Sequence, residues 1–176
     1  PQELHITNLD GKSYSHTFQI DASYPLFKGF ELTAAYRYNL VKATYNGQLM
    51  WKPLQSRYKG LLTASYKTPL GLWQFDATVA LNGGGRMPEP YTLASGNLSW
   101  DRNYKAYGQL NAQITRYFHH FSVYIGGENL TNFKQKNPIV GYQNPWDNGF
   151  EPTMIYGPIQ GAMGYVGIRL NLGKRM

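Results

Sequence analysis

Apolar and polar residues alternate along most of this chain with a period of two. The alternation runs through seven segments, at residues 12–24, 29–40, 57–67, 73–82, 105–115, 121–128 and 161–172. In the third segment, for example, Leu62 and Tyr66 share one parity, whereas Thr63 and Lys67 share the other. Successive side chains of a strand point to opposite faces, so each segment predicts a β-strand with one apolar and one polar face.

The connections between these segments alternate between short and long. The short connections are residues 25–28, 69–72 and 118–120, and the long ones are residues 41–56, 83–103 and 130–160. Outer-membrane barrels have short periplasmic turns and long extracellular loops, and their tilted strands need about 9 to 11 residues to span the membrane. We therefore expect an all-β fold, an antiparallel up-and-down transmembrane β-barrel in the bacterial outer membrane.

Aromatic residues gather beside the short connections. They are Tyr24, Phe27 and Phe30 at the first, Tyr66 and Trp73 at the second, and Tyr117, Phe118 and Phe121 at the third. Aromatic residues favour strands in any protein, but their common position at one end favours an interfacial girdle at the membrane surface.

The composition is consistent with such strands and excludes several other classes. The 176 residues include 15 Tyr, 19 Gly and no Cys, which rules out a disulfide framework or a cysteine-based zinc site. No stretch approaches the roughly 18 consecutive apolar residues of a membrane helix, and the sequence opens without the features of a signal peptide. The net charge of +7 comes from Lys and Arg scattered along the chain, so we expect no nucleic-acid partner.

An odd number of strands predicts that the barrel is larger than this sequence. Complete single-chain bacterial barrels have an even number of strands, and an open sheet edge in lipid would leave its backbone groups unpaired. The polar parity also carries charges of both signs, such as Asp21, Arg37, Asp76 and Glu128, which a wide lumen tolerates. We expect residues 1–176 to be part of one barrel domain and to form its C-terminal seven strands.

The C-terminal third carries the motifs of a known family. Residues 126–139 read GGENLTNFKQKNPI, residues 144–146 read NPW, residues 156–158 read YGP, and residues 164–172 read GYVGIRLNL. Together they resemble the last two strands of TonB-dependent outer-membrane receptors. The resemblance implies a 22-stranded barrel with an N-terminal plug and a Ton box, neither of which this sequence contains.

The resemblance also implies a function and a set of partners. Such receptors import a siderophore, haem, cobalamin or an oligomeric substrate with energy passed on by TonB. The implied partners are the TonB complex, which binds the missing N-terminal part, outer-membrane lipid and lipopolysaccharide, with a surface lipoprotein as a further candidate. The pattern Gly167-x-x-Leu170-x-Leu172 resembles the signal read by the barrel-assembly machinery. We expect no cofactor and assign no ligand-binding residue, because such groups lie on the plug and the loops.

Three other patterns bear on function. Adjacent residues such as His119 and His120 seldom bind one metal, so we expect no metal site there. Ser122 near His120 is the only local pairing that suggests a nucleophile, and it forms no triad, so we expect no enzyme. The prolines and aromatics of residues 130–160 predict an ordered loop, which either contacts ligand or shapes the vestibule.

Two alternative classes stay open at this point. One is an outer-membrane barrel enzyme or adhesin, and the other is a soluble β-sandwich that serves as a binding module. The sandwich predicts that one set of residues meets across a core, whereas the barrel predicts that the same residues face lipid. These residues are Phe30, Leu62, Val79, Ile114 and Val166.

Overall fold

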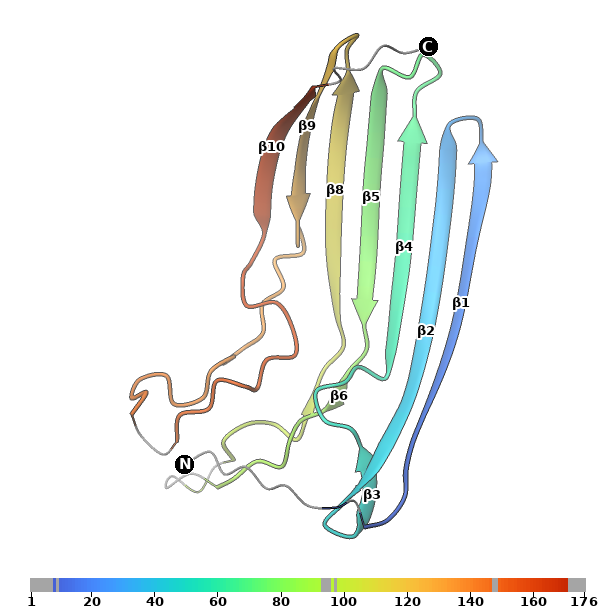
Figure 1. Cartoon of the computed structure of the whole chain (residues 1–176). Helices are drawn as coiled ribbons and strands as arrows, with labels where there is room; N and C mark the ends of the chain where they lie inside the picture. Colours follow the sequence, from blue (N-terminus) through green and yellow to red (C-terminus); the bar gives the residue numbers. More distant parts are fainter. Residues whose placement is uncertain (1–7, 9, 93–95, 97, 147–148, 171–176) are drawn as a thin grey trace.

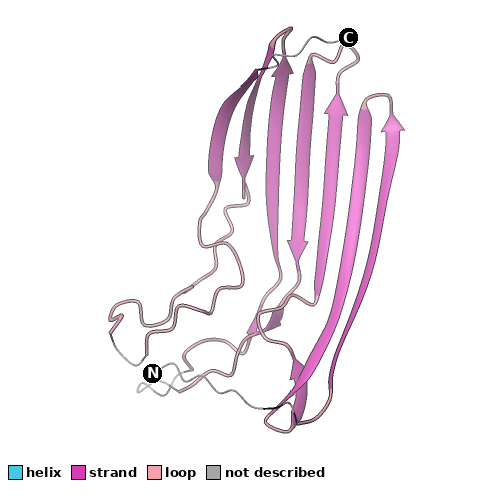
Figure 2. Cartoon of the chain, in the orientation of Figure 1, coloured by secondary structure: helices cyan, strands magenta, loops and turns pink. Residues whose placement is uncertain are grey.

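The computed structural model describes residues 8, 10–92, 96, 98–146 and 149–170. Within these residues the chain consists of strands, turns and loops, and Figure 2 shows no helix among them. Accordingly, no helix in the described part of the chain could span a bilayer. Asn171 and Leu172, the end of the predicted last strand, lie outside the described residues.

Seven long strands form the sheet in the order β1-β2-β4-β5-β8-β9-β10, and the short strand β3 pairs with β2. A separate pair, β6 with β7, lies in the loop region. The bounds are β1 Ser13–Phe27, β2 Phe30–Tyr45, β3 Gln48–Trp51, β4 Tyr58–Lys67, β5 Trp73–Asn82, β6 Gly85–Arg86, β7 Asn103–Tyr104, β8 Tyr107–Tyr117, β9 Phe121–Glu128 and β10 Met163–Leu170. All neighbouring long strands are antiparallel, which confirms the predicted all-β, up-and-down arrangement.

The tight turns and the long loops lie at opposite ends of the sheet. Figure 1 shows the turns between β1 and β2, β4 and β5, and β8 and β9 at one end, and the long connections at the other. Gly29 and Gly71 sit in two of these turns with φ of 86° and 66°, a conformation that glycine adopts without steric cost.

The strand register separates the side chains into two faces. One row across the sheet is apolar or small from β2 to β10, and consists of Leu32, Ala64, Ala77, Ala112, Gly127 and Gly164. The neighbouring row is polar over four strands, and consists of Thr33, Thr63, Thr78 and Asn111. We call the side of the first row the apolar face and the side of the second row the polar face.

No second layer covers the apolar face within the described residues. Leu62, Ile114 and Val166 are 44%, 40% and 73% exposed, and they share this face with Phe30 and Val79. The β-sandwich alternative required these five residues to meet across a core, and they do not. The described sheet thus exposes a broad apolar surface on which no other part of the described chain packs.

The predicted long connection at residues 41–56 was wrong in its first part. Strand β2 continues to Tyr45 and forms a hairpin with β3. The turn is Asn46-Gly47, with φ of 48° and 76°, and positive φ at both central residues is what a type I′ hairpin turn requires. Lys42 interrupts the alternation of apolar and polar residues, so periodicity did not predict this part of the strand.

Two tyrosine–glycine pairs join the last two strands on the polar face. Tyr165 lies opposite Gly126, and Gly167 lies opposite Tyr124. A Cβ atom built at either glycine would clash with the ring of its tyrosine. Each ring therefore occupies the space above a glycine, so a side chain at either glycine would displace it.

Candidate functional site

The polar face carries a network of hydrogen bonds that crosses the strands near the tight turns. Ser65 Oγ donates to Asp76 Oδ1 at 2.6 Å, and Gln74 Nε2 donates to the same carboxylate at 2.9 and 3.0 Å. Tyr117 OH donates to Gln74 Oε1 at 2.8 Å, which connects β8 to β5. The network fixes polar side chains on a face that no other part of the described chain covers.

Arg37 lies further along the same face, toward the long loops. Its Nε and Nη2 atoms donate to Gln19 Oε1 at 2.9 and 2.7 Å, and Gln19 Nε2 donates to Asp21 Oδ1 at 3.0 Å. The Gln19 amide thus connects the Arg37 cation to the Asp21 anion through hydrogen bonds. These side chains are exposed, as expected for charges that face water.

The long connections pack on one another and form a small core of their own. Met87, Tyr104 and Met154 are buried, and Leu54, Trp100 and Tyr156 pack around them. The rings of Tyr104 and Tyr156 stack with their centroids 4.2 Å apart. This loop cluster joins all three long connections, so the loops form one ordered unit at one end of the sheet.

Burial raises the pKa of the Tyr104 phenol, and the Ser56 hydroxyl at 3.3 Å offsets part of this increase. Burial also raises the pKa of Tyr156, and the charge of Asp101 adds to the effect. Both phenols are therefore neutral at neutral pH, and they support the loops through packing.

Asn129 fixes the start of the loop at residues 130–160. Its side chain is almost fully buried, and its Nδ2 atom donates to the carbonyls of Phe133 and Gln160 at 2.8 and 3.1 Å. Its Oδ1 atom accepts from Thr131 Oγ1 and from the Phe133 amide, both at 3.2 Å. Its φ of 51° is left-handed, which Asn tolerates better than most residues.

Gln135 performs the same role further along this loop. Its Nε2 atom donates to the Met154 carbonyl at 2.7 Å, and its Oε1 atom accepts from the amides of Tyr156 and Gly157 at 2.8 and 3.2 Å. The ring of Phe133 stacks on Tyr107 of β8 at 4.4 Å. The prediction of an ordered loop is confirmed for its described residues.

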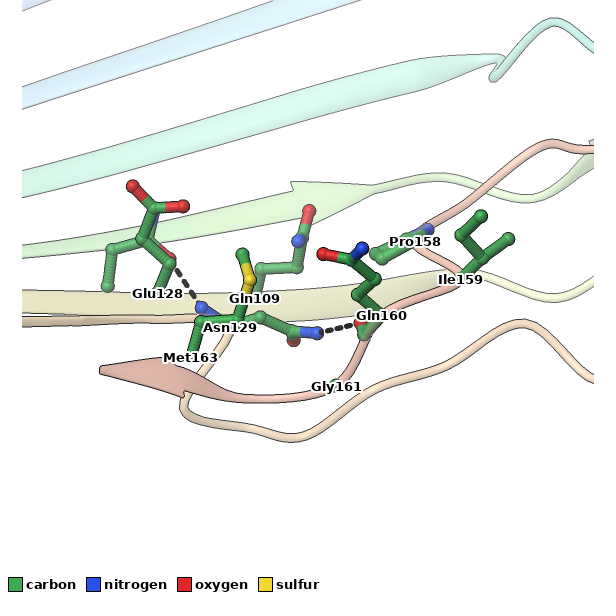
Figure 3. A pocket seen from close by; sticks show the side chains of 9 residues that line it. Gln109, Glu128, Asn129, Pro158, Ile159, Gln160, Gly161 and Met163 are labelled. Atoms are coloured by element: carbon green, nitrogen blue, oxygen red, sulfur yellow. Dashed lines mark hydrogen bonds between the residues drawn. The ribbon is translucent and has the colours of Figure 1, made fainter. Parts of the chain in front are cut away.

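A cavity of about 300 Å³ opens where this loop meets the polar face. Gln109, Asn111 and Glu128 line it from the strands, and Pro158, Ile159, Gln160 and Gly161 line it from the loop, together with Asn129 and Met163. Figure 3 shows the Asn129 amide reaching the Gln160 carbonyl at the boundary of the cavity. The lining is mainly apolar, and the side chains of Gln109, Asn111, Gln160 and Glu128 add polar groups to it.

The residues considered for chemistry lie apart from this cavity. His119 and His120 sit in the tight turn between β8 and β9, at the opposite end of the sheet, with their ring centroids 4.2 Å apart. Ser122 is 2% exposed, whereas His120 is exposed. Among the described residues, no three His, Cys, Asp or Glu side chains gather as metal ligands would.

Periodicity does not predict the cavity or the amide residues near it. Asn129 and Gln160 are 31 positions apart, and no periodic pattern marks them or Gln135. A usable signal was the Asn129-Leu130-Thr131-Asn132 stretch directly after β9, because Asn129 and Asn132 both adopt positive φ. Such residues mark turns with fixed side-chain hydrogen bonds.

The comparisons with known proteins agree with this geometry. No protein-family model and no curated protein matches the sequence. Among solved structures, the chain is similar to the crystal structure of the siderophore receptor PiuA from Acinetobacter baumannii, with a TM-score of 0.57 and 11% sequence identity. The chain has a receptor-like β fold. The match covers 90% of this chain and 22% of the receptor chain, and at this identity the similarity shows the fold alone.

Proposed function

We propose that this chain forms part of the barrel wall of an outer-membrane receptor that imports a scarce nutrient. The candidate nutrients are a siderophore, haem, cobalamin or an oligomeric substrate, and the energy for import comes from TonB. One observation carries the proposal: a single sheet has an uncovered apolar face, a polar face with charges, and its ordered long loops at one end.

The order of side chains along the apolar face supports a transmembrane position. Phe30 lies next to the tight turn of β2, and Tyr36 stacks on Tyr58 at 6.3 Å further along the strands. Tyr36 lies six positions beyond Phe30, which is about 20 Å along the strand at about 3.4 Å per residue. Leu32 and Ala34 lie between them. An apolar band flanked by aromatic residues is the order of side chains on the lipid face of outer-membrane barrels.

In this proposal each face has a separate role. The apolar face contacts the outer-membrane lipid and lipopolysaccharide, and the polar face lines a lumen. The loop cluster forms a rigid rim, and the cavity beside Glu128 and Gln109 offers polar groups to a ligand or to a plug. The unpaired edges of β1 and β10 would pair with further strands of the barrel.

The partners proposed are those of the receptor class. The TonB complex supplies energy through a plug, the barrel-assembly machinery inserts the protein, and a surface lipoprotein is a candidate cover for the loops. We propose no catalytic activity, because the geometry offers a barrel wall, a rim of loops and a cavity with a mainly apolar lining. Ser122 is buried beside β10, where a substrate cannot reach it.

Uptake assays with a strain that lacks the gene test this proposal. The probes are ferric siderophores, haem, cobalamin and oligosaccharides, each measured with and without an uncoupler of the inner membrane. We expect the gene product in the outer membrane and an energy-dependent loss of uptake of one probe class. A gene product in the soluble fraction, or unchanged uptake of every probe, would contradict the proposal.

A further inference from the structure

A belt of aromatic rings runs across the sheet beside the tight turns. Phe27 stacks on Phe30 at 5.0 Å, and Tyr66 stacks on Phe75 at 6.4 Å. Trp73 stacks on Phe75 at 6.3 Å, and Phe118 stacks on Phe121 at 4.6 Å. We call these seven residues the turn-side belt: Phe27, Phe30, Tyr66, Trp73, Phe75, Phe118 and Phe121.

One charged residue occupies a position within this belt. Arg116 lies on the apolar face of β8, opposite Trp73 in the strand register. Its guanidinium carbon lies 4.7 Å from the centroid of Trp73 and 5.6 Å from that of Phe118. The ion pairs formed among the described residues do not include Arg116. The side chain is only partly exposed, because the two rings cover part of it.

This position constrains what can neutralise the charge. A guanidinium on the lipid face of a barrel is costly at the bilayer midplane and tolerated near the headgroups. Contacts with ring faces leave the N–H groups at its edge free to donate. Those groups form a planar fork that matches two oxygens of a phosphate.

We propose that Arg116, held between Trp73 and Phe118, binds the phosphate of an anionic phospholipid in the leaflet beside the tight turns. One acyl chain of this lipid lies along Ile114 and Ile125, which are exposed neighbours on the apolar face. The inference rests on the proposed function in one respect, because it requires the sheet to span the outer membrane.

Arg169 provides a matched control. It lies on β10 opposite Ser122, and Ser122 lies opposite Tyr117, the residue next to Arg116. Arg169 therefore has nearly the same distance from the tight turn but belongs to the polar face. Arg169→Gln therefore removes one positive charge at nearly the same depth as Arg116→Gln, and it leaves the lipid-facing site unchanged.

The test is native mass spectrometry of the natural gene product in mixed nanodiscs of phosphatidylglycerol and phosphatidylcholine. We expect the wild-type protein and Arg169→Gln to retain phosphatidylglycerol preferentially. Arg116→Gln removes one charge-assisted contact with the phosphate, so we expect this variant to prefer phosphatidylglycerol about tenfold less than wild type does. Arg116→Lys keeps the charge and loses the planar fork, so its preference lies between the two. Heat-modifiable migration in gels confirms that each variant is folded.

The outcomes separate this inference from the proposed function. Equal phosphatidylglycerol retention by wild type and Arg116→Gln, or an equal loss in Arg169→Gln, overturns the lipid site. Displacement of the lipid by inorganic phosphate alone also overturns it, because the site then recognises a free anion. A membrane-embedded protein that imports its ligand without any lipid preference overturns this inference and leaves the proposed function intact.

Discussion

Replacing Asn129 should open the base of the loop at residues 130–160 without unfolding the sheet. The Asn129 side chain forms four hydrogen bonds within the described chain. Each contributes about 1 kcal/mol net, and water can replace part of them, so Asn129→Gly should cost about 2 to 4 kcal/mol. Asn129→Ala should cost about 1 kcal/mol more, because the left-handed φ of 51° is unfavourable for alanine.

Hydrogen exchange at the Phe133 amide measures this effect directly, because that amide donates to Asn129 Oδ1. An added cost of 1.4 kcal/mol corresponds to about tenfold faster exchange when exchange follows local opening. Asn137 is the control: its φ of 48° is also left-handed, and its side chain is exposed. Asn137→Ala should lower the stability of the loop only by the strain of placing alanine in a left-handed conformation. If the Phe133 amide exchanges no faster in Asn129→Ala than in Asn137→Ala, the Asn129 side chain does not hold the base of the loop.

Three further predictions follow from the packing of the chain. Gly167→Ala should weaken the pairing of β9 with β10 by about 1 to 3 kcal/mol in urea unfolding, since its Cβ meets the Tyr124 ring, whereas Gly164→Ala should change it by less than about 0.5 kcal/mol. Burial raises the pKa of Tyr104, so the unfolded loops ionise first above about pH 10 and the stability of the loop cluster falls as pH rises further. Protease cleavage of the loops should therefore increase as the pH rises above about 10, and Tyr104→Phe should reduce this increase. The same dependence of cleavage on pH in wild type and Tyr104→Phe would contradict the prediction. Replacing residues 141–150 by Asn-Gly, between the paired backbones of Val140 and Glu151, should abolish ligand uptake and leave the Phe133 amide protected. Unchanged uptake would show that the tip does not contact ligand.

Periodicity was sufficient to predict the seven long strands, because each strand has one mainly apolar face and one mainly polar face. The hairpin of β2 and β3 escaped this argument because Lys42 falls on the apolar parity, although Asn46-Gly47 was a local turn signal. The strand pattern also predicted that neighbouring strands would pair in chain order. Tight turns join three of these pairs, and strands consecutive in sequence commonly pair across longer connections as well.

The loop cluster could not be predicted in the same way. Its contacts join residues distant in sequence, such as Ser56 with Tyr104 and Tyr91 with the Gly149 carbonyl at 3.1 Å. Neither helical nor strand periodicity encodes such contacts. The cavity likewise brings together residues of β8, β9, β10 and the loop at residues 130–160, so its lining is known only from the folded structure.

In the proposed function, one face of the sheet contacts lipid and the other contacts water. Residues 1–176 contain no cysteine, so a single introduced cysteine is unique within this part of the protein. We would place them at Leu62, Val79 and Ile125 on the apolar face and at Thr63, Thr78 and Gln113 on the polar face, in the outer membrane of intact cells permeabilised to small reagents. A water-soluble maleimide should label the polar-face positions and spare the apolar-face positions. Equal labelling of both faces would contradict it.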